Sequence, residues 1–243
     1  MNYKDIIAEL HSKANPKNVK GMQRFGIQGD NILGISIVEL RKIAKHIGKN
    51  HDLACRLWDS RIHEARLLAA FIDDPAQVHE KQMDLWVKDF NSWDICDQVC
   101  SGLFDKTPYS FSKAKEWSGA EQEFIRRAGF ALMAALSVHD KKAHDKQFIK
   151  FFPIIIKYAV DERNFVKKAV NWALRQIGKR NKTLNIQAIK TAEDIIKLHP
   201  KSSSARWIAR DALRELKSDQ VRKRLLKKSK PRSSNTEGYN TEG

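Results

Sequence analysis

A helical motif that occurs twice is the feature that most constrains how this chain folds. The segment F-I-R-R-A at 124–128 returns as F-V-K-K-A at 165–169. Looser versions of the pattern occur at 64–70 and at 205–213. A unit that recurs at roughly 40 residues cannot bury its apolar face alone, so neighbouring units must stack to share a core. The recurrence therefore predicts helix pairs stacked into an elongated array.

Helix-forming patterns cover almost the whole chain. Apolar residues recur at intervals of three and four, and alternating strand patterns of any length are absent. The predicted helices span 3–12, 17–25, 37–47, 51–58, 61–72, 76–89, 93–104, 110–117, 120–138, 142–159, 161–178, 183–198, 202–216 and 219–228. Helix pairs of this period are typical of HEAT-like arrays, whose concave face binds extended partners. We therefore predict an all-α fold, a curved α-solenoid of HEAT-like helical repeats, with one repeat domain over 1–228 and a disordered tail over 229–243.

The net charge of the chain favours a polyanionic partner. The sequence has 45 Lys and Arg against 29 Asp and Glu, a formal net charge of +16. The basic end at 217–228 holds six cations and one anion, so most of the excess lies in the body of the chain. A basic body is typical of proteins that bind nucleic acid. A cytosolic protein that is merely basic is the alternative.

Cysteine usage and hydropathy favour a cytoplasmic protein without a metal site. The three cysteines, Cys55, Cys96 and Cys100, are too few for a disulfide framework. No segment resembles a signal peptide, and no apolar run approaches the roughly 18 residues that a membrane span needs. Cys96 and Cys100 lie one helical turn apart without a partner pair of ligand spacing, which predicts core positions. Motifs for a bound phosphate or cofactor are absent as well.

The predicted helix over 161–178 has an apolar face and an aromatic, basic face. Asp161 and Glu162 supply negative charge at its start. The apolar face holds Val166, Ala169, Val170, Ala173, Leu174 and Ile177. Trp172 lies away from that face, beside Phe165. Three cations surround the ring there, namely Lys168, Arg175 and Lys179. A flat ring among cations suits a nucleic acid, and the alternative is a second packing interface that buries the ring.

The stretch N-S-W-D-I-C-D-Q-V-C at 91–100 places a second tryptophan next to a carboxylate. With Ser92 or Asn91 as the N-cap, Trp93 and Asp97 lie one turn apart, opposite the core face. Asp94 falls in the first turn, where it would complement the helix dipole. Alone, Asp97 would be read as a surface salt bridge. Together with tryptophans and cations from neighbouring helices, it predicts a cleft that suits a cationic sugar–base unit flanked by phosphates.

These motifs resemble those of a known family. The segments W-D-I-C-D at 93–97, F-I-R-R-A at 124–128 and F-V-K-K-A-V-N-W-A-L-R at 165–175 are similar to motifs of the DNA alkylation repair protein family, the AlkD-like HEAT-repeat DNA glycosylases. The resemblance also includes L-G-I-S and the following L-R at 33–41, and it extends over most of residues 20–216.

The resemblance implies a DNA repair glycosylase. Such an enzyme excises positively charged N3- and N7-alkylated purines by hydrolysis of the N-glycosidic bond, without the base flipping that most glycosylases use. It implies double-stranded DNA containing alkylated bases as the partner, and neither a metal nor an organic cofactor. Since an open solenoid can bind a duplex by itself, we expect a monomer.

The resemblance also implies roles for individual residues. Trp93 and Trp172 would contact the deoxyribose of the lesion. Asp97 would stabilise the sugar cation and position the attacking water, and Arg127 would contact DNA near the lesion. The cations expected to hold neighbouring phosphates are Lys168, Arg175 and Lys179.

Two positions depart from the family pattern. Ser92 stands where other members have an aromatic residue, and Phe25 stands where a tyrosine is common, so a hydroxyl is missing. The pairing of Trp93 with Asp97 survives both changes. Because the family also contains members with little or no excision activity, two alternatives stay open. One is a non-catalytic HEAT-repeat protein that binds branched or damaged DNA, and the other is a protein-binding HEAT scaffold.

The remaining aromatic and titratable residues fit structural roles. Trp58 and Trp86 are expected in the core. Trp207 lies beside Arg206 and Arg210 on the last repeat helix, where a structural role is favoured and extension of the basic face is the alternative. Four scattered histidines are expected at the surface, namely His46, His51, His63 and His79.

Overall fold

The computed structural model describes residues 1–27, 29 and 31–229. Within these residues the secondary structure is helical and contains no strand, which confirms the predicted all-α class. The helices are α1 (Tyr3–Ser12), α2 (Pro16–Arg24), α3 (Ile37–Ile47), α4 (His51–Asp59), α5 (His63–Ile72), α6 (Glu80–Trp86), η1 (Val87–Asp89), α7 (Trp93–Gly102), η2 (Phe104–Lys106), α8 (Ser110–Ser118), α9 (Glu123–His139), α10 (Asp145–Ile149), α11 (Phe152–Tyr158), α12 (Asn164–Gly178), α13 (Lys182–Leu198), α14 (Ser203–Leu216) and α15 (Asp219–Ser229). From residue 230 onward, the tail predicted for 229–243 lies outside the described residues.

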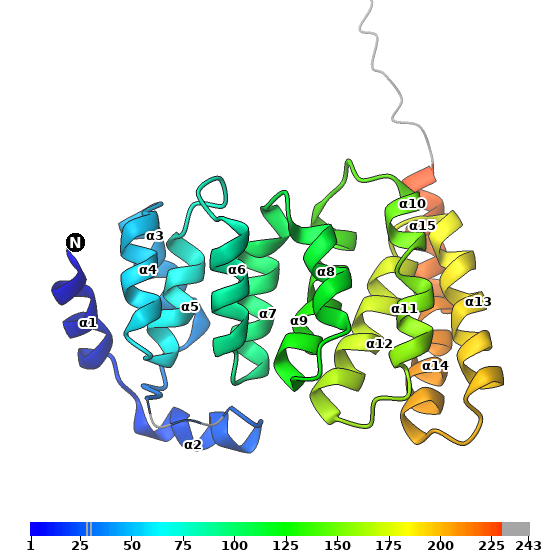
Figure 1. Ribbon diagram of the computed structural model, residues 1–243, viewed down its shortest axis with the longest axis horizontal. Helices are drawn as coiled ribbons and strands as arrows, with labels where there is room; N and C mark the ends of the chain where they lie inside the picture. Colours follow the sequence, from blue (N-terminus) through cyan, green and yellow to red (C-terminus); the bar gives the residue numbers. More distant parts are fainter. Residues whose placement is uncertain (28, 30, 230–243) are drawn as a thin grey trace, which may run out of the picture.

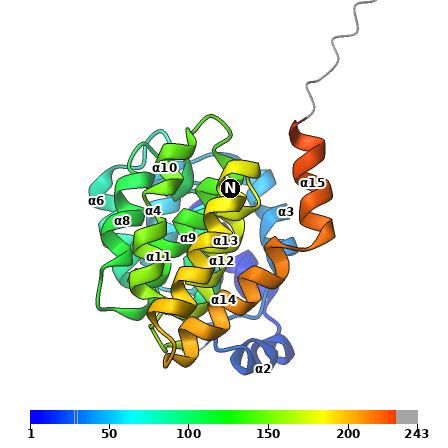
Figure 2. The ribbon, with the colours of Figure 1, turned by 90° about the vertical axis from the view of Figure 1, so that its right-hand side faces the viewer.

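The helices stand side by side in chain order along the longest axis of the molecule (Figure 1). Helices α5, α7, α9, α12 and α14 form an inner row in which each helix packs against the next. Partner helices cover this row from the other side, with α4 on α5, α8 on α9, α11 on α12 and α13 on α14. The fold is therefore the predicted curved α-solenoid of HEAT-like repeats. Helix α2 lies across one edge of the array (Figures 1 and 2).

The apolar core lies between the two rows and is continuous from Ile6 in α1 to Leu216 in α14. This continuity supports our proposal of a single repeat domain over 1–228. Trp58 and Trp86 stack inside it with ring centroids 4.0 Å apart, which confirms their predicted core positions. Two of the cysteines are also fully buried, as predicted, namely Cys96 and Cys100.

Gly129 lets α8 and α9 touch at the level of their backbones. A Cβ atom at this position would lie 2.3 Å from the backbone nitrogen of Ser118 and 2.9 Å from the carbonyl oxygen of Ala114. Because backbone atoms of two packed helices cannot move apart cheaply, any larger residue would separate them. The contact fixes the position of α9. Arg127, a predicted site residue, lies on the same helix two residues before Gly129.

Two predicted helices are shorter or divided in the structure. The helix predicted over 142–159 is two helices, α10 and α11, with Pro153 at the second position of α11. Proline is compatible with the first turn of a helix but disrupts its interior, so a new helix begins just before Pro153. The helix predicted over 76–89 begins at Glu80, because the Asp74 carboxylate accepts a hydrogen bond from the Ala76 N–H and holds a turn.

The helix predicted over 161–178 begins at Asn164. Asp161 pairs with Arg126 of α9 at 2.6 Å and with Arg163. Glu162 accepts hydrogen bonds from the Ser204 N–H, at 3.1 Å, and from other groups at the start of α14. These carboxylates therefore tie neighbouring repeats together, and the prediction that they start their own helix was wrong.

Within the described part of the chain, no helix is both long and apolar enough to cross a membrane.

Candidate functional site

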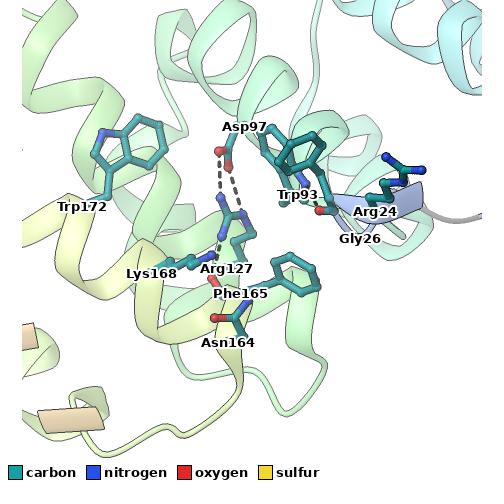
Figure 3. Close-up of a pocket in the computed structure, with 10 residues that line it drawn as sticks. Arg24, Gly26, Trp93, Asp97, Arg127, Asn164, Phe165, Lys168 and Trp172 are labelled. Carbon is teal, nitrogen blue, oxygen red and sulfur yellow. Dashed lines mark hydrogen bonds and ion pairs between the residues drawn. The ribbon is translucent and has the colours of Figure 1, made fainter. Parts of the chain in front are cut away.

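A cleft of about 600 Å³ lies between the inner row and the segment that follows α2 (Figure 3). Its lining residues are Arg24, Phe25, Gly26, Trp93, Asp97, Arg127, Asn164, Phe165, Lys168 and Trp172. They come from α7, α9 and α12 and from the end of α2. The structure thus brings together five of the seven predicted site residues, namely Asp97, Trp93, Trp172, Arg127 and Lys168.

Trp93 opens α7 and forms one wall of the cleft. Of the two predicted N-cap residues, Ser92 and Asn91, Ser92 is the one found, although its side chain makes no capping hydrogen bond. The Trp93 indole Nε1 donates a hydrogen bond of 2.9 Å to the carbonyl oxygen of Phe25. This bond orients the ring and ties the segment after α2 to α7.

Asp97, one turn further along α7, is held by Arg127 of α9 (Figure 3). Arg127 Nε donates to Asp97 Oδ1 at 3.0 Å, and Nη2 donates to Oδ2 at 2.7 Å. Arg127 Nη1 donates to the carbonyl oxygen of Phe165 at 2.6 Å. Arg127 therefore links α7, α9 and α12 and fixes the orientation of the carboxylate in the cleft.

The ion pair between Asp97 and Arg127 is largely shielded from solvent. The Asp97 side chain is 19% exposed and the Arg127 side chain only 7%. Burial raises the pKa of Asp97, and the Arg127 guanidinium opposes this effect. Burial alone would lower the pKa of Arg127, but attraction by Asp97 outweighs it and the pKa is raised. Because both carboxylate oxygens accept hydrogen bonds from the guanidinium, the geometry is that of an ionised pair.

Helix α12 forms the opposite wall with Trp172 and Lys168 (Figure 3). Trp172 is half-buried, because one part of its side chain packs against the core while another part lines the cleft. The packing interpretation of this residue therefore holds in part, and contact of the ring with a nucleic acid stays a prediction. Lys168 is exposed and has no hydrogen bond or ion pair among the described residues, so its ammonium group is available to an anion.

Gly26 brings the segment after α2 against α12. Its φ of +80° lies in the left-handed region, and a Cβ atom there would lie 2.7 Å from Cζ of Phe165. Glycine satisfies both conditions, since it has no Cβ atom. The segment from Arg24 to Gly26 thus spans from Trp93 on α7 to Phe165 on α12 and borders the cleft on one side.

Arg175 and Lys179 do not line the cleft. Arg175 Nη1 lies 2.8 Å from Glu215 Oε2 and 3.4 Å from Asp211 Oδ2, both on α14. Lys179 Nζ lies 2.6 Å from Glu215 Oε1. These ion pairs join the last two inner helices, and a phosphate would have to compete with them. Contacts of Arg175, Lys179 and the buried Arg127 with DNA therefore stay predictions.

His63 of α5 and Asp94 of α7 form a buried pair. His63 is 4% exposed, and its Nε2 lies 2.8 Å from Asp94 Oδ2. Burial would raise the pKa of Asp94, but the hydrogen bond from His63 outweighs it and the pKa is lowered. The predicted surface position of His63 is therefore wrong, whereas His46 and His79 are exposed. Asp94 connects α7 to α5 besides lying in the first turn.

Sequence reasoning missed Arg24 and Asn164 as lining residues and Gly26 as a contact. Their place in the cleft depends on how α2 docks across the array, and helical periodicity carries no signal for that. The glycine at position 26 was the one local sign, because a glycine directly after a predicted helix marks a turn. Among the described residues, no group of three or more His, Cys, Asp or Glu side chains could hold a metal ion.

The sequence matches the family described as DNA alkylation repair enzyme over residues 6–216. Because the match covers most of the chain, the protein belongs to this family.

Individual relatives are distant. The chain is 21% identical over 203 residues to the uncharacterized protein Lin0241 of Listeria innocua, which covers 82% of this chain and 88% of the relative. It is 21% identical over 136 residues to the uncharacterized protein Lmo0209 of Listeria monocytogenes, covering 54% of this chain and 61% of the relative. A solved structure matches with a TM-score of 0.72 and 20% identity over 79% of this chain and 83% of the other. That protein is described as a member of a new family, related to the HEAT-like repeat DNA glycosylases, with affinity for branched DNA structures. At this identity the likeness shows the fold.

Proposed function

We propose that the cleft binds double-stranded DNA at an alkylated base and hydrolyses the N-glycosidic bond of positively charged N3- and N7-alkylated purines. The observation that carries the proposal is the oriented carboxylate of Asp97 between the two tryptophans of the cleft, Trp93 and Trp172. Membership in a family of DNA alkylation repair enzymes supports it. A monomer acting in the cytoplasm, without a bound cofactor, belongs to the same proposal.

The chemistry assigned to the cleft is the stabilisation of a positive charge. When the bond between C1′ and the base nitrogen breaks, its electron pair moves to the alkylpurine and neutralises the charge of the base. The deoxyribose becomes a cation. Asp97 would stabilise this cation, as a single positioned electrostatic group does, by about 3 kcal/mol. Water then adds to C1′ and loses its proton, which leaves an abasic sugar and the free base.

Arg127 leaves Asp97 free to act on the water. Each carboxylate oxygen can accept more than one hydrogen bond, and Arg127 uses one on each. The remaining lone pairs can orient a water molecule. We assign Arg127 as a positioning residue and propose that Lys168 and Arg24, both exposed at the rim, hold phosphates beside the lesion. Following the family resemblance, we propose that the base is not flipped.

A second candidate function is non-catalytic binding of branched or damaged DNA. The solved structure with affinity for branched DNA favours it, since that protein shares the fold. The basic rim would serve either function. The cleft itself favours excision over binding alone. A desolvated carboxylate repels the anionic backbone of DNA, so a site that only binds DNA does not require the carboxylate, its guanidinium and the two tryptophans.

The test is the release of 7-methylguanine and 3-methyladenine from methylated duplex DNA, with wild type beside Asp97→Asn. We expect release by wild type and a loss of about 100-fold or more in the variant, with duplex binding retained. Release at equal rates would exclude the role of Asp97. Binding without release by either protein would favour the second candidate function.

A further inference from the structure

A second surface, separate from the cleft, combines an exposed tryptophan with cations. Trp207 on α14 is 42% exposed, whereas Trp58, Trp86 and Trp117 are buried. Its indole N–H has no hydrogen-bond partner in the part of the chain that the structure describes. Single exposed apolar side chains are common on protein surfaces, so the exposed ring indicates a site only together with the cations around it.

Cations from two helices lie near Trp207, Lys167 on α12 and Arg206 and Arg210 on α14. The Lys167 ammonium lies 5.7 Å from the ring centroid and reaches it from α12. Arg210 lies almost one turn further along α14, is exposed, and has no partner among the described residues. Arg206 is partly engaged, since its Nη1 donates to the carbonyl oxygen of Pro200 at 2.7 Å. Trp207 and Arg210 also line a shallow hollow of about 470 Å³ on α14.

The carboxylates of α14 do not neutralise this surface. Asp211 also lines the hollow, where it pairs with Arg214 and with Arg175 of α12. Glu215 pairs with Arg175 and Lys179. These pairs lie in the C-terminal half of α14. They leave positive charge in excess around Trp207, at Lys167 and Arg210.

Helix α12 connects this surface to the cleft. Lys168 and Trp172 of α12 line the cleft. Lys167, the residue before Lys168, contacts the ring of Trp207. Helices α12 and α14 pack against each other and run side by side (Figure 2). A DNA strand that leaves the cleft along the inner row therefore meets Trp207 next.

We propose that Trp207, with Lys167 and Arg210, is a stacking site for an unpaired nucleotide of a DNA whose duplex part lies in the cleft. Away from the ends of a duplex, both faces of each base are covered by its neighbours, so there an exposed ring can stack only on a base that has left the duplex. Exposed aromatic rings flanked by cations bind single strands in this way, the ring taking the base and the cations taking the phosphates. The inference rests on DNA binding by the cleft and is independent of excision.

The test compares two labelled DNAs by fluorescence anisotropy, a blunt duplex and the same duplex with a single-stranded overhang. We expect wild type to bind the overhang DNA more tightly by roughly fivefold or more, which is the effect of stacking one base. Trp207→Ala should lose this difference and bind the blunt duplex as wild type does. Trp207→Phe should keep most of it, and Arg210→Gln should lower the salt dependence of overhang binding. Ile186→Ala, which removes an exposed apolar side chain from α13, is the control and should change neither affinity.

Each other outcome decides between the proposals. Equal affinity of wild type for the two DNAs, with duplex binding intact, overturns the stacking site and leaves the function of the cleft untouched. An equal loss of affinity for both DNAs in Trp207→Ala would mean that Trp207 contacts the sugar–phosphate backbone of the duplex, and it would overturn the stacking site. Binding of neither DNA by wild type would overturn both proposals. Melting temperatures of the variants are measured beside these affinities, and we expect them to be close to that of wild type because Trp207 is exposed.

Discussion

The guanidinium of Arg127 holds both carboxylate oxygens of Asp97, through Nε at 3.0 Å and Nη2 at 2.7 Å. The third nitrogen, Nη1, is bound to the carbonyl oxygen of Phe165. The carboxylate assigned to catalysis is thus oriented by a neighbouring repeat, which is itself anchored to the next repeat. The orientation of Asp97 depends on the stacking of α7, α9 and α12.

We predict that Arg127→Gln lowers both stability and excision. It leaves the Asp97 carboxylate buried without its cation, and breaking a buried pair from one side costs about 3–5 kcal/mol. The double variant Arg127→Gln with Asp97→Asn should recover much of the melting temperature, because no charge stays unpaired, but not the excision of methylated bases. Thermal unfolding and base release are measured on the same samples.

The control for this prediction is Asp161→Asn. It removes a carboxylate that pairs with Arg126 and Arg163 outside the cleft. This variant should be less stable than wild type and should still excise at permissive temperature. If the double variant excised as fast as wild type, neither member of the Asp97–Arg127 pair would have a role in the reaction.

Trp172→Ala should reduce excision more than stability. The ring is half-buried and lines the cleft, so its loss removes a face for the lesion while most of the core remains. We expect at least about a tenfold loss of rate, which corresponds to about 1.4 kcal/mol, and a smaller loss in Trp172→Phe. Trp207→Ala, the same substitution outside the cleft, should leave excision from a blunt duplex unchanged. A fall in melting temperature without any loss of rate would give Trp172 a packing role only.

Gly26→Ala tests whether the segment after α2 shapes the cleft. Both Gly26 and Gly48 have positive φ, at +80° and +75°, so alanine strains the backbone by about 1–3 kcal/mol at either position. Only at Gly26 would the new Cβ atom also meet a neighbour, Phe165, at 2.7 Å. We therefore expect a loss of stability in both Gly26→Ala and Gly48→Ala, and a loss of excision in Gly26→Ala alone. Equal excision by the two variants would show that the position of this segment does not matter for the reaction.

The fold could be predicted from the sequence because its signals are local. The apolar stripe that repeats along Val166, Val170 and Leu174 specifies a helix and its buried face, and all three residues are fully buried. The return of the same motif at 124–128 and 165–169 specifies how neighbouring helices stack. The local pattern could not specify the break before Pro153, because the apolar residues continue with helical spacing across the two helices.

The site could be predicted only in part. Trp93 and Asp97 were found because they share one helix face, and their meeting with Trp172 followed from the order of the repeats. The engagement of Arg175 by Glu215 was not visible, because a salt bridge between two helices depends on their side-chain positions. The approach of Gly26 to Phe165 was hidden for the same reason, since it joins the first and later repeats across the cleft.

Acid should weaken the junction between α9 and α12 through Asp161. Burial would raise the pKa of this carboxylate, but hydrogen bonds from Arg163 and Arg126 outweigh it and the pKa lies below the ordinary 3.8. The unfolded chain therefore binds a proton at a higher pH than the folded chain does. The contribution of Asp161 is complete above about pH 3.8 and is lost as the pH falls through the lower, folded pKa.

Denaturant unfolding at several acid pH values should show a shallower fall of stability for Asp161→Asn than for wild type. Asp59→Asn, an exposed carboxylate on α4, serves as the control and should follow wild type. Parallel curves for Asp161→Asn and wild type would exclude this source of acid sensitivity.

Lys168 and Arg175 both lie on α12, but we predict that only Lys168 contributes strongly to DNA binding. Lys168 is exposed at the cleft without a partner among the described residues, whereas Arg175 is paired with Asp211 and Glu215 of α14. A cation that binds a phosphate releases a counterion, so its removal lowers the slope of log affinity against log salt by about one. Lys168→Gln should show this change on duplex DNA at several salt concentrations, and Arg175→Gln should show a smaller one. Equal slopes for the two variants would mean that DNA displaces the ion pairs of α14 and uses both cations.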